Sequence, residues 1–430
     1  MKRIAIVAIG SWGDVGPLIT LGSGLAGAGY EVVLVTHAAY AEDATRAGLD
    51  FAGLSGDPVA IPEDERGRQW LESGGNGLRF ALHLVRIARP LQRAVLDEAY
   101  AACRSCAAVL HTPFASFATH VAERLDLPSI VVGQQPVTRT GAWRAFLVPD
   151  GLPLGRAGNR LSYRLMEQAM WQPYRSGFQR WRRDAGMPDA GPFGPAARLY
   201  TGRVPVVYGF SSLVVTRPAD WPAWHRAAGY WTAPARGSWD SEDARVAAFL
   251  RDGPPPVFVG FGSMTSRNPQ RVLARVVEAL RVVGCRGLLA GAAGTAGTAG
   301  ARPPLPEAPD MLVAEGFSHA RALPGVAAAV HHGGAGTVAT SLMAGVPTVV
   351  VPFFADQFFW GRRVAALGAG PEPLPMARLD APGLAGRLRD VLASPAMRER
   401  AAGLGARLRA EDGVAAAVEL IDRHLATPRG

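Results

Sequence analysis

The hydrophobic residues of this chain gather in short runs that alternate with longer stretches of helical spacing. In the first half, the runs are rich in β-branched residues and lie at 2–10, 31–36, 107–111 and 129–133. Helical patterns fall between and after them, at 17–29, 78–102, 116–125 and 159–186. Because strand, helix and strand follow one another with such short connections, the strands are predicted to be parallel.

The same alternation begins again at residue 256. Apolar runs follow at 256–263, 286–290, 311–313, 327–330 and 348–351, and the last helices are expected between 381 and 426. The sequence therefore predicts an α/β protein with two doubly wound, Rossmann-like domains that face each other across a cleft. We expect an N-terminal domain at 1–216, a linker at 217–238, a C-terminal domain at 239–405 and a final segment at 406–430.

The composition fits two globular domains and excludes several classes of protein. With 430 residues, 48% of them hydrophobic and 19% charged, the chain is long enough for two cores and disorder is not expected. No window approaches the ~20 apolar residues of a membrane-spanning helix, and the apolar run at 4–9 is too short for a signal peptide. Three cysteines form no disulfide framework, so we expect a cytoplasmic protein.

The net charge of +9 comes almost entirely from arginine. Lys2 is the only lysine, so arginine supplies the other 44 of the 45 basic residues, a bias typical of a GC-rich genome. These arginines are scattered and no nucleic-acid-binding motif accompanies them, so no nucleic-acid partner is expected. The positive field favours a nucleoside diphosphate and leaves peripheral contact with an anionic membrane open. The sequence also leaves open whether the protein is a monomer or a homodimer.

A glycine-rich turn in the second half carries the clearest chemistry. The strand-like run at 326–330 leads into His331-His332-Gly333-Gly334-Ala335-Gly336-Thr337, and a helical pattern follows. Free N–H groups and the dipole at such a helix start favour an anion, and glycines let the backbone close on a phosphate. The next apolar run ends at Asp356 and Gln357, an acid and an amide suited to a polyhydroxylated group. Together these features predict a nucleotide-sugar site.

The ordered set of motifs resembles the donor-binding signature of a large glycosyltransferase family. That family includes plant secondary-metabolite, sterol-type and vancomycin-type enzymes, and the likeness is strongest to the sterol-type and antibiotic-type branches. The matching residues are 331–337, 344–347, Pro352, Asp356, Gln357, Trp360, Gly361, Arg363 and 367–370. The resemblance implies the GT-B fold, an acceptor-binding first domain, a donor-binding second domain and a C-terminal helix that crosses back to the first domain.

The resemblance also implies the donor-binding residues. His332 and Thr337 would contact the phosphates, Asp356 and Gln357 the sugar hydroxyls, and Phe317 would stack on the base. The full expected set is Gly262, Ser263, Phe317, His332, Gly334, Ala335, Gly336, Thr337, Asp356 and Gln357. The chain contains no Asp-x-Asp motif, so we expect no metal and no cofactor beyond the nucleotide sugar as co-substrate. UDP-linked and dTDP-linked donors both remain open.

An acid in the first glycine-rich turn is the candidate base. Asp14 closes the segment at 10–14, which resembles the turn of the sterol-type enzymes, with Trp12 where they carry arginine. An acceptor hydroxyl must lose a proton as it attacks, so a base is needed there. From position alone, Asp14 is equally well interpreted as a helix cap. His111 is the second candidate for the base, and packing is the alternative role for it.

Aromatic residues of the first half predict an apolar acceptor. The expected acceptor-binding residues are Trp12, Gly13, His111, Trp143 and Phe146, with further walls at Trp171, Tyr174, Phe178 and Trp181. A sterol, polyketide, terpenoid or other lipid-like alcohol is favoured, while a peptide or aromatic aglycone remains open. The resemblance implies inverting, metal-independent hexose transfer. The alternatives are a nucleotide-sugar-modifying enzyme on the same fold and a catalytically silent homologue that binds a nucleotide sugar or a lipid.

Overall fold

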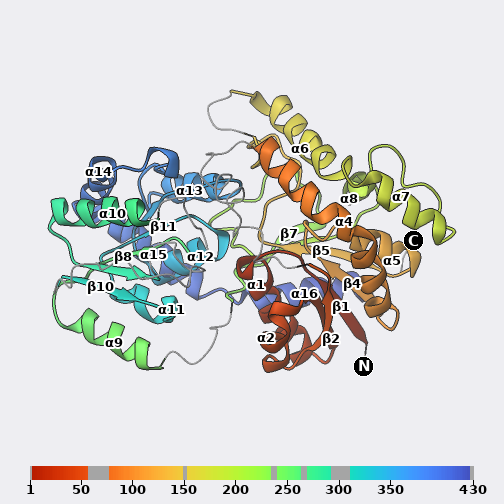
Figure 1. The fold of residues 1–430 in the computed structure, drawn as a ribbon, viewed down its shortest axis with the longest axis horizontal. Helices are drawn as coiled ribbons and strands as arrows, with labels where there is room; N and C mark the ends of the chain where they lie inside the picture. Colours follow the sequence, from red (N-terminus) through yellow and green to blue (C-terminus); the bar gives the residue numbers. More distant parts are fainter. Residues whose placement is uncertain are drawn as a thin grey trace. The chain divides into compact units, whose positions relative to one another are not determined.

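The chain folds into two compact units, each a parallel sheet with helices packed on it (Figure 1). The computed structural model describes residues 2–56, 77–148, 153–233, 240–262, 269–291 and 310–426. Of these, unit 1 contains 2–56, 77–233 and 412–426, and unit 2 contains the rest. The predicted fold class, two doubly wound α/β domains, is confirmed by these two sheets.

Unit 1 is built on seven strands in the order β3-β2-β1-β4-β5-β6-β7, parallel in every pairing. The strands are β1 (Arg3–Val7), β2 (Glu31–His37), β3 (Asp50–Leu54), β4 (Ala108–His111), β5 (Ser129–Gly133), β6 (Val206–Tyr208) and β7 (His225–Ala227). The chain order reverses between β1 and β4. Ligands of such sheets bind beyond the carboxyl ends of the strands at this switch point, where the turn after β1 carries Asp14.

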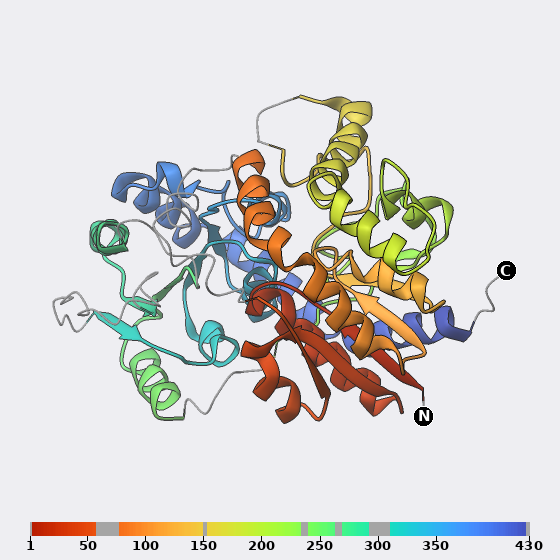
Figure 2. The ribbon, with the colours of Figure 1, turned by 45° about the vertical axis from the view of Figure 1, so that its right-hand side comes forward.

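The unit 1 sheet is covered on both faces, because successive side chains of a strand point to opposite sides. Ile4 and Ile6 pack with α1 and α16, whereas Ala5 and Val7 pack with α4 and α5 (Figure 2). The helices of this unit are α1 (Trp12–Gly27), α2 (Ala41–Arg46), α4 (Gly77–Cys103), α5 (Ala118–Arg124), α6 (Gly155–Trp171), α7 (Arg175–Asp184), α8 (Arg198–Thr201) and α16 (Gly413–Ala426). Two 3₁₀ turns, η1 (Ala38–Tyr40) and η2 (Pro195–Ala197), complete it.

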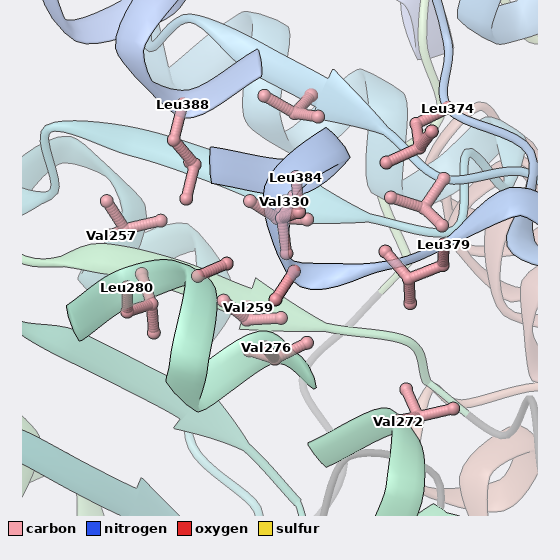
Figure 3. Packing of buried hydrophobic residues seen from close by; sticks show 14 of the residues in the cluster. Val257, Val259, Val272, Val276, Leu280, Val330, Leu374, Leu379, Leu384 and Leu388 are labelled. Atoms are coloured by element: carbon pink, nitrogen blue, oxygen red, sulfur yellow. The ribbon is translucent and has the colours of Figure 1, made fainter. Parts of the chain in front are cut away.

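Unit 2 has five parallel strands in the order β10-β9-β8-β11-β12. They are β8 (Val257–Gly260), β9 (Gly287–Ala290), β10 (Met311–Ala314), β11 (Ala328–His331) and β12 (Thr348–Val350). The helices are α9 (Asp240–Arg251), α10 (Pro269–Val283), α11 (His319–Ala322), α12 (Ala335–Ala344), α13 (Gln357–Ala366), α14 (Ala381–Leu392) and α15 (Pro395–Arg409), with 3₁₀ turns η3 (Leu323–Gly325) and η4 (Met376–Arg378). Figure 3 shows one of its cores, in which valines of β8 and β11 meet leucines of α10 and α14.

The expected linker at 217–238 is largely part of unit 1. It contains β7, the seventh strand of the sheet, and Trp231, which is completely buried in the core. The indole N–H of Trp231 donates to the carbonyl oxygen of Gly413 at 3.0 Å, and the Tyr30 hydroxyl donates to Asp422 at 2.6 Å. These contacts fix α16 on unit 1, whereas α15, which includes residues 406–409 of the expected crossing segment, belongs to unit 2. No helix in the described parts of the chain is long and apolar enough to cross a membrane.

Two helix boundaries differ from the sequence prediction. The first helix begins at Trp12 and not near residue 17, because Ser11 and Asp14 form a capping box at its start. The long helix expected at 159–186 is two helices, α6 and α7, with Pro173 between them. Proline has no backbone N–H and its ring clashes with the carbonyl group of the preceding helical turn, which explains the break.

Candidate functional site

In unit 2, the glycine-rich turn presents the start of a helix at the carboxyl end of β11. Gly334 caps α12, and the first backbone hydrogen bond of the helix runs from Val338 N–H to its carbonyl oxygen at 2.9 Å. The N–H groups at 334–337 therefore have no helical partner. A Cβ built on Gly336 would meet nothing within 4 Å. The chain thus leaves open space beside unpaired donors at the positive end of the helix dipole, which suits a phosphate.

The His332 side chain lies between the ends of two neighbouring strands. A Cβ on Gly262, after β8, would be 3.2 Å from His332 Cε1, and one on Gly334 would be 2.5 Å from Nε2. Gly262 has a φ of +62°, which favours glycine there on its own. Burial lowers the pKa of His332 to about 4, so its ring is neutral near pH 7. Its Nδ1 is buried with no hydrogen-bond partner among the described residues, so it can form a hydrogen bond with a ligand.

The side chain of His331 differs from that of His332 because both of its ring nitrogens form hydrogen bonds within the protein. Its ring is completely buried, and Nδ1 accepts a hydrogen bond from Gly333 N–H at 3.1 Å. The proton therefore sits on Nε2, which donates to Ser341 Oγ at 3.0 Å, and Ser341 in turn donates to the Val338 carbonyl oxygen at 3.1 Å. Burial keeps the pKa of His331 well below its ordinary value. This chain of hydrogen bonds between neutral groups stabilises the turn that carries the N–H groups at the start of α12.

The acid and amide after β12 lie on a tightly held loop beside that turn. The side-chain oxygen of Gln357 accepts from the N–H groups of Phe353 at 2.8 Å and Phe354 at 3.3 Å, and its side chain is buried. Asp356 accepts from the indole N–H of Trp360 at 3.0 Å. Ala355 has a φ of +52°, a strained conformation for a residue with a Cβ. Both residues thus fix the loop, in addition to the sugar contacts expected from the sequence.

In unit 1, the half-buried carboxylate of Asp14 is held from two sides. Its Oδ2 accepts from the N–H and the hydroxyl of Ser11, each at 3.0 Å, and its Oδ1 accepts from the side-chain amide of Gln135 at 3.0 Å. Burial raises the pKa of Asp14, while the bonds from Ser11 and Gln135 oppose that rise. A Cβ on Gly10 would lie 2.4 Å from Oδ2. Asp14 is therefore both the third residue of α1, capping Ser11, and a carboxylate with raised basicity.

Gln135 is the hydrogen-bond partner of Asp14 that the sequence did not predict. It follows β5, and it lies 121 positions from Asp14 in the chain. Gln134 and Gln135 are both buried, and the side-chain oxygen of Gln134 has no partner within the described residues. The only signal in the sequence is this polar pair directly after a buried strand.

Comparisons with known proteins identify the family to which both halves of the chain are similar. The glycosyltransferase family 28 N-terminal domain matches residues 4–143, and the erythromycin biosynthesis protein CIII-like C-terminal domain matches residues 296–419. The sterol 3-beta-glucosyltransferase of Neosartorya fischeri is 34% identical over 98% of this chain and 29% of its own length. The chain belongs to the family 1 glycosyltransferases. It spans about three tenths of the length of the curated relatives it matches.

Solved structures of other glycosyltransferases share the GT-B fold of this family 1 member. SsfS6 of Streptomyces sp. SF2575, complexed with thymidine diphosphate, aligns with a TM-score of 0.63 at 21% identity and covers 98% of this chain and 100% of that one. The calicheamicin glycosyltransferase CalG4 aligns with a TM-score of 0.68 at 19% identity over 100% of both chains. At these identities the likeness establishes the fold.

Two residues of the expected donor site need separate comment, because one is buried in a core and the other lies outside the described residues. Phe317 lies in a core of unit 2, only 7% exposed, with its ring edge-on to Phe258 at 6.2 Å and to His319 at 5.2 Å. Its ring is covered by its own core neighbours, so the expectation that it stacks on the nucleotide base is not supported. Ser263, the second residue of the expected Gly262-Ser263 turn, lies outside the described residues.

His111 is a packing residue of the glycosyltransferase fold. Its Nδ1 lies 3.0 Å from the Thr112 carbonyl oxygen and its Nε2 lies 3.2 Å from Thr119 Oγ1. Burial lowers the pKa of His111 to about 4, so the ring is a weak base. Because the side chain is buried and both nitrogens have protein partners, the structure favours the packing interpretation over the base and acceptor-binding roles.

The aromatic residues expected around the acceptor fall into two groups. Trp143 and Phe146 are half-buried against a small cluster that includes Tyr163, separate from the main cores, and Trp12 is half-buried beside Tyr40 with ring centroids 6.0 Å apart. Gly13 is exposed. The more distant walls proposed from the sequence are core instead: Trp171, Phe178 and Trp181 are buried, with the first two stacked at 5.5 Å. No group of metal ligands occurs in the described parts of the chain.

Proposed function

We propose that this chain transfers a hexose from a UDP- or dTDP-linked sugar to a hydroxyl of an apolar acceptor, with inversion and without a metal. The observation that carries the proposal is the Asp14 carboxylate, held by Ser11 and Gln135 at the switch point of the unit 1 sheet. A base must take the acceptor proton as the oxygen attacks the anomeric carbon. The raised pKa of Asp14 makes it a stronger base than an ordinary aspartate.

The unit 2 turn supplies the second requirement, which is stabilisation of the departing diphosphate. As the bond from the anomeric carbon to the diphosphate oxygen breaks, negative charge grows on the leaving group. We assign three kinds of donor to that charge: the N–H groups at the start of α12, the Thr337 hydroxyl and Nδ1 of His332. The last has no hydrogen-bond partner among the described residues. These neutral donors support a reaction that needs no metal or cofactor. A single displacement with one base and no protein nucleophile inverts the anomeric centre.

A lipid-like alcohol is the acceptor that the chain supports best. The relatives that cover almost all of this chain are named sterol 3-beta-glucosyltransferases. In unit 1, Trp12, Trp143 and Phe146 are half-buried aromatic residues, and such side chains contribute large apolar contact areas to a binding site. We assign acceptor binding to these three residues, with Gly13 leaving the start of α1 uncovered.

A mass-spectrometric screen tests this function. The purified protein is incubated with UDP-glucose or dTDP-glucose and a panel of sterols, macrolides and phenolics, with and without EDTA. A hexose mass shift on an apolar acceptor that survives EDTA is expected. A shift lost in EDTA would contradict metal independence. Isomerised nucleotide sugar without any acceptor product would instead identify a nucleotide-sugar-modifying enzyme, and thermal stabilisation by nucleotide without any reaction across the panel would favour a silent homologue.

A further inference from the structure

The outward face of α6 carries two parallel rows of side chains with opposite character. Arg156, Arg160 and Arg164 are exposed and spaced four residues apart, so they lie in a line along the helix. One position further on, Ala157, Leu161 and Leu165 form a second exposed line. The two leucines are 53% and 61% exposed, unusually high for large apolar side chains. In Figures 1 and 2, α6 lies at the rim of unit 1.

Contacts on the opposite face of α6 fix the rotation of the helix about its own axis. Tyr163 and Met166 are buried in the small apolar cluster, and Ser162 Oγ accepts from Ala145 N–H at 2.8 Å. Glu167, the only acid of the helix, is turned toward Arg139, whose Nε donates to it at 2.8 Å. The exposed leucines and arginines therefore stay on the surface because the rest of the helix is anchored.

A third exposed apolar residue lies beside this helix. Phe193 is 70% exposed, and its carbonyl oxygen accepts from the side-chain amide of Gln168 on α6 at 3.0 Å. Gln172 and Trp171 both donate to the neighbouring carbonyl of Pro192, at 2.9 and 3.1 Å. Of the large hydrophobic residues that are exposed in the described chain, only Val282 on α10 lies elsewhere. The three on unit 1 are thus gathered on or next to one helix.

The charges on this face are available to a partner. Arg160 donates to Asp220 at 2.8 Å, whereas Arg156 and Arg164 form no ion pair within the described residues. Arginines beside an apolar row form the pattern of helices that lie in a membrane interface, where leucines enter the headgroup region and cations meet anionic lipids. A second copy of this chain fits less well, because it would bring arginine against arginine.

We propose that the α6 face, made of Ala157, Leu161, Leu165, Phe193 and the arginines at 156, 160 and 164, docks on an anionic lipid bilayer. Leu161, Leu165 and Phe193 enter the boundary between headgroups and acyl chains, and Arg156 and Arg164 contact lipid phosphates. Docking would hold unit 1 at the surface in which lipid-like alcohols reside. The surface itself is independent of Asp14 and of the glycine-rich turn, so the proposal does not depend on the chemistry assigned above.

Vesicle co-sedimentation tests the proposal with the intact protein. Vesicles of phosphatidylcholine alone are compared with vesicles that also contain phosphatidylglycerol, at low and high salt. We expect binding to the mixed vesicles that weakens as salt rises. The double variant Arg156→Gln/Arg164→Gln should lose about tenfold or more in partitioning, since each cation near the surface contributes ~1 kcal/mol. The double variant Leu161→Ser/Leu165→Ser should lose at least as much in partitioning, because it removes apolar side chains that enter the bilayer.

Matched controls separate this face from the rest of the surface. Val282→Ser removes an equally exposed apolar side chain from α10, and Arg389→Gln/Arg407→Gln removes two exposed charges from unit 2. Both controls should partition like the unchanged protein. Equal binding to neutral vesicles, or equal losses in the control variants, would overturn the proposal. So would sedimentation velocity showing a dimer that the leucine variant dissociates while its vesicle binding stays intact.

Discussion

The two half-sites of this glycosyltransferase are assembled in opposite ways. In unit 2, the turn proposed to bind phosphate is local, because one strand, three turn residues and one helix start bring the donors together within a few positions. In unit 1, the Asp14 carboxylate depends on Gln135, which is distant in the chain and arrives from another strand of the sheet. The proposed diphosphate site is therefore encoded by a contiguous motif, whereas the environment of the proposed base is encoded by the fold.

The two half-sites also differ in the chemical groups that they offer to a ligand. In unit 2, the buried side chains of His331, before the turn, and of Gln357, after β12, hold backbone in place, so the groups offered to a ligand are mainly backbone N–H groups. In unit 1 the proposed reactive group is the side chain of Asp14 itself, and its surroundings adjust its pKa. Substitutions in the two units should therefore have different effects. Changes that fill the space beside α12 should weaken nucleotide binding, and changes around Asp14 should alter turnover and its pH dependence.

The largest effect is expected for Asp14→Asn. The amide cannot accept the acceptor proton, so turnover should fall by ~10²–10⁴-fold, the usual contribution of a general base. Steady-state rates with the acceptor found by the mass-spectrometric screen measure this. Asp412→Asn is the matched control, because Asp412 caps α16 in the same unit by accepting from Ala415 N–H at 2.9 Å. Equal losses in both variants would mean that capping, and not proton transfer, is what Asp14 provides.

Gly336→Ala should weaken nucleotide binding by about tenfold, which corresponds to ~1.4 kcal/mol. A Cβ there would meet no atom of the described residues within 4 Å, so the expected conflict is with a diphosphate lying beside the helix start. The folded protein should be unharmed, or more stable by ~0.5–1 kcal/mol, since alanine favours a helix over glycine. Gly386→Ala, on α14 and equally open, should raise stability without changing affinity. Unchanged affinity in Gly336→Ala would place the diphosphate elsewhere.

Gln135→Ala should reduce turnover about fivefold and shift its pH dependence. The Gln135 amide donates to the Asp14 carboxylate and so favours the charged form, which lowers the pKa of Asp14. Removing it raises that pKa, so the acid limb of kcat/KM should move to higher pH. Gln134→Ala changes the neighbouring buried glutamine, which forms no hydrogen bond with Asp14 among the described residues, and should leave the acid limb where it is. An acid limb that stays in place in Gln135→Ala would refute the positioning role.

The smallest effect on activity is expected for Ser341→Ala, which breaks the brace behind the glycine-rich turn. The buried Nε2–H of His331 then loses its acceptor, and an unsatisfied buried donor costs ~1–3 kcal/mol of folding free energy. Thermal or denaturant unfolding should show this loss while kcat stays within about twofold. A large fall in kcat with unchanged stability would indicate that Ser341 acts on the ligand directly.

The sequence predicted what depends on local patterns. Alternating apolar runs and helical spacing predicted the parallel sheets, and the order of glycines, His332 and Asp356 predicted a donor half-site that remains a proposal. Contacts between distant segments were not predictable. Phe317 lies in a core because Phe258 and His319 cover it, β7 joins the sheet through pairing with β6, and Gln135 meets Asp14 only once the strands are ordered. His111 was ambiguous for the same reason, since Thr119 satisfies it from the next helix.

The central claim is that nucleotide binding resides in the unit 2 turn and proton transfer in Asp14 of unit 1. Calorimetric titration of UDP and of thymidine diphosphate into the unchanged protein, Asp14→Asn and Gly336→Ala tests it most directly. The account predicts that Asp14→Asn binds its nucleotide with unchanged affinity although its turnover is lost, while Gly336→Ala binds about tenfold more weakly. Weakened binding in Asp14→Asn together with unchanged binding in Gly336→Ala would contradict the division of work between the two units.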